Sequence, residues 1–266
     1  MLDPENSDFH SVVARSTYLL SGPSKTAGVT AVGTGFVVGM PVQRAPSKTM
    51  PVLITAAHVL DGITGDTASI TLRSKKEDGS YAPVTRPLLI RKNGVDLFYR
   101  HSNQDLAAMV LYPAPPELMT QGVIDHTFIL GDEAFEAMKI HPGDEVFVAG
   151  FPHGMASTSA YAPIVRGAHI SSFPLYPARI VDRMLIDFLV YPGNSGGPVY
   201  CAYFGRSIGR RTVHGVVYRG IVGVVIEEFK APVTGEKLFV SRIVPGQYII
   251  DLLQQLPAFR ARSTVQ

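Results

Sequence analysis

The feature that most limits the possible folds is a series of short runs rich in β-branched residues, separated by turn residues. The chain has 25 glycines and 20 prolines in 266 residues. Such spacing is typical of an all-β sandwich or barrel. Apolar residues make up 46% of the chain and charged residues 17%, which excludes a disordered protein. We predict strands at 30–38, 52–57, 68–72, 88–91, 107–111, 145–149, 164–171, 184–188, 198–202, 213–217, 221–226 and 238–242.

The sequence predicts two helices and one internal boundary. Apolar side chains repeat with a period of 3.6 residues after Pro245 and stop at Pro257, which predicts a C-terminal helix. A shorter helix is expected at 133–138. The prolines of 112–116 block both helix and central strand. We therefore divide one overall domain into a β-barrel half with a polar N-terminal extension (1–112), a linker (113–127), a second β-barrel half (128–243), and a helix and tail (244–266).

The segment Pro192-Gly193-Asn194-Ser195-Gly196-Gly197-Pro198-Val199 carries the strongest chemical signal. Glycines on both sides of Ser195 permit a sharp turn that exposes a hydroxyl. A serine nucleophile also needs backbone N–H donors for the oxyanion that forms on attack. We predict an oxyanion hole at Gly193, Asn194 and Ser195. The alternative is a plain glycine-rich turn with a solvent-exposed serine.

Two further segments supply partners for such a serine. In Leu53-Ile54-Thr55-Ala56-Ala57-His58, small residues leave room for an imidazole that titrates in the range of a general base. Asp105 stands before the apolar run 106–111, where a buried carboxylate needs a partner. Taken alone, each residue is more often structural. Together they predict a His58–Asp105–Ser195 triad.

The order His, Asp, Ser and these local motifs resemble the trypsin/chymotrypsin clan. Gly33-Thr34-Gly35-Phe36-Val37-Val38 and the run 141–154 resemble bacterial HtrA-type proteases, and so does an asparagine before the serine. The resemblance implies two antiparallel six-stranded β-barrels and a serine endopeptidase that works through an acyl-enzyme. It departs from the HtrA type after Arg242, where too few residues follow for a peptide-binding PDZ module.

The resemblance also locates a specificity pocket at Leu189 and Val190, with a wall at Gly223, Val224 and Val225. These residues are apolar, so a small or medium aliphatic P1 side chain is expected. The alternative is that they belong to the core. Trypsin-like zymogens are switched by a freed amino group that pairs with an aspartate before the serine. Because Asn194 is neutral, we expect activation without an N-terminal cut, with the turn held internally or ordered by substrate or an activating partner.

Composition argues against other classes. The histidines show no metal spacing and Cys201 is the only cysteine, so neither a metal, a cofactor nor an intramolecular disulfide is expected. A net charge of +2 does not suggest nucleic-acid binding. No signal peptide or membrane span is recognised, which predicts a cytoplasmic protein that does not bind membranes. The basic stretch from Arg206 to Arg219 is either a solvated loop or a partner-docking loop. A pseudoprotease and an esterase stay open as alternative functions.

Overall fold

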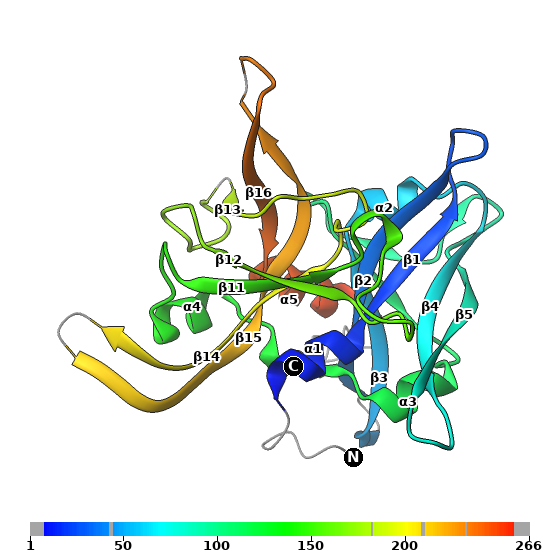
Figure 1. The fold of residues 1–266 in the computed structure, drawn as a ribbon, viewed down its shortest axis with the longest axis horizontal. Coiled ribbons are helices and arrows are strands. Elements are labelled where there is room, and N and C mark those ends of the chain that lie inside the picture. The colour runs from blue at the N-terminus through cyan, green and yellow to red at the C-terminus, as the bar shows by residue number, and fades with distance from the viewer. Residues whose placement is uncertain (1–7, 43–44, 182, 209–210, 232, 258–266) are drawn as a thin grey trace, which may run out of the picture.

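The computed structural model describes residues 8–42, 45–181, 183–208, 211–231 and 233–257. They form two barrel-like sheets that lie side by side (Figure 1). The first runs in the order β5-β4-β1-β2-β3-β9-β8, with β10 added beside β2. Its strands are β1 (Thr17–Pro23), β2 (Thr30–Val42), β3 (Ala45–Thr55), β4 (Thr67–Lys75), β5 (Tyr81–Leu89), β8 (Tyr99–Arg100), β9 (Ala107–Val110) and β10 (Ile124–Asp125).

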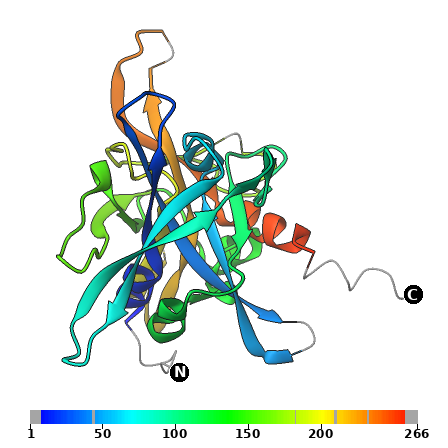
Figure 2. The ribbon, with the colours of Figure 1, turned by 90° about the vertical axis from the view of Figure 1, so that its right-hand side faces the viewer.

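The second sheet has the order β12-β11-β14-β15-β16-β13. Its strands are β11 (Glu145–Gly150), β12 (Ile164–His169), β13 (Met184–Ile186), β14 (Pro198–Ile208), β15 (Arg211–Lys230) and β16 (Lys237–Pro245). A small separate hairpin joins β6 (Arg91–Lys92) to β7 (Val95–Asp96). The hairpin of β15 and β16 extends well beyond the body of the molecule (Figure 2).

The predicted all-β architecture with a C-terminal helix is confirmed, with two corrections. The described first sheet has eight strands rather than six, because the two-residue strand β8 adds to its edge beside β9 and the two-residue strand β10 pairs in parallel with β2. The predicted strands 213–217 and 221–226 form one long strand, β15. The proline-rich segment chosen as a linker contains α3 (Pro116–Gln121) as well as β10.

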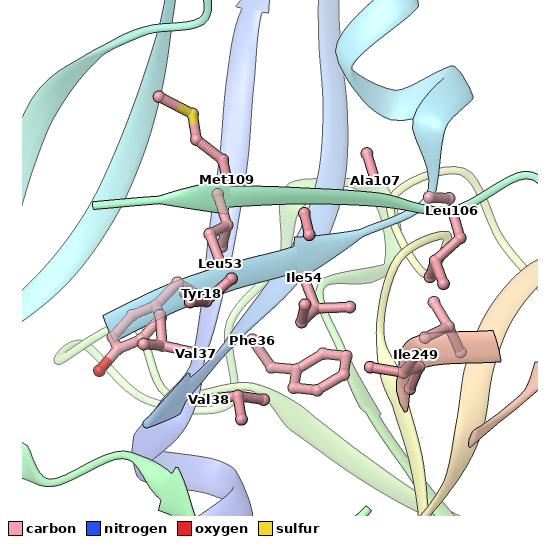
Figure 3. Packing of buried hydrophobic residues seen from close by; sticks show 14 of the residues in the cluster. Tyr18, Phe36, Val37, Val38, Leu53, Ile54, Leu106, Ala107, Met109 and Ile249 are labelled. Carbon is pink, nitrogen blue, oxygen red and sulfur yellow. The ribbon is translucent and has the colours of Figure 1, made fainter. Parts of the chain in front are cut away.

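Helix α5 (Gly246–Gln255) packs its apolar face on the first sheet's core. Ile249, Leu252 and Leu253 are buried in one cluster with Phe36, Leu106 and their neighbours. Figure 3 shows Ile249 beside Phe36, below the layer formed by Ile54 and Leu53. Because α5 follows directly from β16 of the second sheet, it ties the two sheets together. No helix in the described part of the chain is long and apolar enough to cross a membrane.

The N-terminal segment, which the sequence left unassigned, contributes α1 (Phe9–Ser16) and the buried strand β1. Arg73 of β4 is 4% exposed and donates to the carbonyls of Ala14, Arg15 and Thr17, where α1 ends. It also donates to the Tyr161 carbonyl at 2.9 Å, on the loop before β12. A guanidinium has several donors in a fixed fork, so one side chain satisfies the helix end and connects it to the second sheet.

Candidate active site

His58 and Asp105 meet because the strands before and after them pair. β3 ends at Thr55, and α2 (Ala57–Asp61) carries His58 in its first turn. β9 pairs with β3 so that Thr55 faces Ala107, which places Asp105 beside the helix. Asp105 Oδ2 lies 2.5 Å from His58 Nδ1, and Oδ1 accepts the His58 backbone N–H at 2.9 Å. Both carboxylate oxygens therefore fix one histidine, its ring and its backbone.

The surroundings shift the pKa of both groups. Burial by itself lowers the pKa of His58, but the hydrogen bond to Asp105 and the charges of Asp105, Glu227 and Asp61 outweigh it, so the pKa lies above the ordinary value of 6.5. Burial by itself raises the pKa of Asp105, but the hydrogen bond and charge of His58 outweigh it, and the pKa is lowered. The pair thus keeps an ionised carboxylate against the ring over a wide pH range.

Ser195 lies on the serine loop, residues 187–197, which joins β13 to β14. Its Oγ donates to the Ile226 carbonyl at 2.8 Å. Ser195 and His58 line the same open cleft, which has a volume of about 580 Å³. Within the described chain no hydrogen bond joins the two side chains. The predicted serine and histidine therefore line one cleft, Asp105 is bonded to the histidine, and the serine hydroxyl is held by a carbonyl.

The serine loop leaves two backbone donors free. Neither the Gly193 nor the Ser195 N–H donates a hydrogen bond within the described residues. The Pro192 carbonyl accepts the His153 N–H at 2.5 Å. Because the N–H and C=O of a trans peptide point in opposite directions, the Gly193 N–H points away from His153. The predicted oxyanion hole needs one correction. The Asn194 N–H is not free, since it donates to the Tyr191 carbonyl at 2.9 Å.

Comparison with known proteins identifies the family of this chain. The family model described as "Trypsin-like peptidase domain" matches residues 33–209. The chain belongs to this family. It is accordingly a serine endopeptidase, whose substrates are proteins or peptides.

Solved structures that share the fold include the serine endoprotease from Yersinia pestis, with a TM-score of 0.51, 16% identity, and coverage of 96% of this chain and 67% of that chain. They also include the Rv3671c protease from M. tuberculosis in its active form, with a TM-score of 0.50, 18% identity, and coverage of 96% of this chain and 87% of that chain. No curated protein matches the chain significantly.

In this peptidase, Thr34 of β2 joins the first sheet to the serine loop, a role that sequence reasoning missed. Its hydroxyl donates to the Gly193 carbonyl at 2.6 Å and accepts the Phe151 N–H at 3.1 Å. Its backbone N–H donates to the Ser195 carbonyl at 2.9 Å. The side chain is fully buried. The signal available in the sequence was a polar residue inside the apolar run 33–38.

The predicted pocket wall needs a second correction. Val224 and Val225 are 0% exposed and belong to the two cores, and Gly223 lies against the Val244 backbone. The register of β15 and β16 shifts between Val225 and Glu227. Beyond that shift β15 lines the cleft with Ile226, Glu227, Glu228, Phe229 and Lys230, opposite Val190, Tyr191 and Pro192. Leu189 is partly exposed but does not line this cleft.

The basic stretch is described only in part. The side chains of Arg206, Arg210 and Arg211 lie outside the described residues. The Arg219 guanidinium packs 5.0 Å from the centre of the Phe128 ring, so this arginine covers an aromatic side chain. In the same described part of the chain, no three His, Cys, Asp or Glu side chains gather in a way that would hold a metal ion.

Replacing Thr34 by valine should destabilise the serine loop. Valine keeps the shape but leaves the Phe151 N–H and the Gly193 carbonyl buried without a partner, at about 1–3 kcal/mol for each group. Thr34→Ser keeps the hydroxyl and is the matched control. Urea denaturation should show a clear loss of stability for Thr34→Val and a smaller one for Thr34→Ser. A Thr34→Val protein as stable as the wild type would contradict the role of the hydroxyl.

Glu227→Gln should lower the pKa of His58. A nearby carboxylate favours the protonated ring, so its removal lets the ring lose its proton at lower pH. NMR titration of the His58 ring measures this directly. Glu236→Gln, an exposed change on the same hairpin, is the control and should leave the pKa in place. A His58 pKa that stays constant or rises in Glu227→Gln would contradict the electrostatic account.

Proposed function

We propose that His58, Asp105 and Ser195 form the catalytic triad of this peptidase, and that the N–H groups of Gly193 and Ser195 form its oxyanion hole. The observation that carries the proposal is the two-point attachment of Asp105 to His58, in the cleft that also holds Ser195. An aspartate that accepts a hydrogen bond from the Nδ1–H favours the tautomer in which Nε2 is unprotonated and able to accept a proton.

The reaction follows from these positions. Ser195 Oγ attacks the peptide carbonyl carbon as its proton passes to His58 Nε2. The oxyanion accepts hydrogen bonds from the Gly193 and Ser195 N–H groups, which have no other acceptor among the described residues. Collapse of the tetrahedral intermediate breaks the C–N bond, and His58 gives the proton to the leaving amine. Water then hydrolyses the acyl-enzyme by the same steps, with His58 again as the base.

The hydrogen bond from Ser195 to Ile226 defines the resting state in this proposal. The hydroxyl must leave the Ile226 carbonyl before His58 can take its proton. Catalytic hydrogen bonds are often loose in the absence of substrate and tighten in the complex.

Ser195→Ala should abolish both labelling by a fluorophosphonate probe and peptide hydrolysis. Because the triad acts as a unit, turnover should fall by roughly 10⁴-fold or more, and Ser195→Ala with His58→Ala should be scarcely worse than Ser195→Ala alone. Ser80→Ala, in the exposed turn between β4 and β5, is the control. Hydrolysis that persisted in purified Ser195→Ala protein would refute the assignment of Ser195.

We also propose that the enzyme prefers small or medium aliphatic P1 residues. Leu189 and Val190 are apolar, and Val190 lines the cleft. The negative charges of the two glutamates on the opposite wall of the cleft are already paired with cations of the same chain. Glu227 pairs with Arg242 at 3.3 Å and Glu228 with Lys237 at 3.1 Å. A cationic substrate side chain would therefore compete with cations already in place.

A peptide-library profile should show cleavage after Val, Ala or Leu in preference to Arg, Lys or Glu. Lys237→Ala should increase cleavage after basic residues, because it frees Glu228, whose Oε1 is buried without a hydrogen-bond partner. Lys230→Ala also changes a lysine of the cleft and serves as the control. If the wild-type profile were dominated by Arg or Lys, the aliphatic preference would be wrong.

A further inference from the structure

Arg166 of β12 reaches across the second sheet to the serine loop. Its Nη2 donates to the Leu189 carbonyl at 2.7 Å and lies 3.5 Å from Asn194 Oδ1. Its guanidinium carbon lies 4.0 Å from the centre of the Phe188 ring and 5.5 Å from that of Tyr191. One cation therefore contacts four residues of the loop that carries Ser195.

The two oxygen acceptors stand on either side of the oxyanion turn. Leu189 precedes the Pro192–Gly193 peptide and Asn194 follows it, so a guanidinium bonded to both links the two ends of the turn. Arg166 is partly buried, and this burial lowers its pKa, so the cation sits in a partly desolvated site. Such a cation gains most from oxygen acceptors and aromatic faces.

Asn194 transmits this contact to the backbone. The residue is 2% exposed. Its Oδ1 accepts the Tyr191 N–H at 2.9 Å, and its own N–H donates to the Tyr191 carbonyl at 2.9 Å. This reciprocal pair encloses Pro192 and Gly193. Fixing the Asn194 amide thus fixes the peptide whose orientation decides where the Gly193 N–H points.

We propose that Arg166 is a positioning residue that holds the serine loop in the conformation in which the Gly193 and Ser195 N–H groups stay free to bind an oxyanion. The inference rests on the proposed oxyanion hole and deepens it. Arg166 supplies, from within the second sheet, a positive charge of the kind that trypsin-like zymogens take from a freed amino group.

Arg166→Met keeps an unbranched apolar stem, with a shorter side chain, and removes the charge and the donors. In the full chain kcat should fall about 10- to 100-fold while KM changes by less than about threefold, because the lost contacts support the transition state. Affinity for a peptide aldehyde, which forms a tetrahedral adduct with the serine, should fall in parallel. Arg166→Ala should regain part of its activity with added methylguanidinium. Arg179→Met, at an exposed arginine paired with Asp251, is the control.

A double-mutant cycle with Asn194→Asp separates positioning from general stability. A carboxylate at this buried place has a cationic partner only while Arg166 is present. The loss of activity caused by Asn194→Asp should therefore be at least about tenfold larger in the Arg166→Met background than in the wild type. Equal effects of Asn194→Asp in both backgrounds would overturn the proposal.

Hydrogen exchange of residues 187–197, followed by mass spectrometry, gives a readout that does not need activity. Arg166→Met should speed exchange at the Tyr191 and Asn194 amides, and Arg179→Met should not. Unchanged exchange, or unchanged kcat in folded Arg166→Met, refutes the role of Arg166. If exchange rises as expected but the wild type has no Ser195-dependent hydrolysis, the proposed triad is wrong, whereas the role of Arg166 in holding the serine loop is supported.

Discussion

The arrangement of the cleft depends on one buried hydroxyl. Thr34 belongs to the first sheet, yet its Oγ1 both donates to Gly193 and accepts from Phe151, which belong to the second. A hydroxyl can do both, whereas an amide or a carboxylate would need more room. Its backbone carbonyl in turn accepts from Thr55 Oγ1 at 2.7 Å, three residues before His58. The histidine and the serine loop are therefore placed relative to each other through a single residue of β2.

The charged residues around the cleft favour protonation of the His58 ring. Asp105, Glu227 and Asp61 all raise the pKa of His58, and arginines hold two of these acids in place. Arg100 bonds Asp61 at 2.5 Å, and Arg242 pairs with Glu227. The ring thus sits in a negative field that stabilises the imidazolium formed when it takes a proton. Asp105 provides the direct contact, and the other two carboxylates act at longer range.

The sequence predicted the parts of the fold and site that are encoded locally. Glycines around Ser195, small residues before His58 and an aspartate before an apolar strand are short patterns, and the β-rich runs that carry them were found. It missed α1 and β1, because a polar N-terminus concealed the buried residues Phe9, Val13, Tyr18 and Leu20. Sequence reasoning also misplaced the cleft wall, because the register shift after Val225 depends on how β15 pairs with β16. Roles such as those of Thr34 and Arg73 arise from partners far away in the chain.

Groups on several elements hold the serine loop, including the backbone of Val225 and Ile226 in β15. Thr34 approaches from β2, the His153 N–H from the turn after β11, and Arg166 from β12. Close approach is possible because Gly196 lacks a side chain, since a Cβ there would lie 2.0 Å from the Thr34 carbonyl oxygen. With Cys201 as its single cysteine, the chain has no internal disulfide to restrain the loop. Buried hydrogen bonds take that part: Thr34, Gly193 and Asn194 are all buried, and hydrogen bonds are stronger where water is kept out.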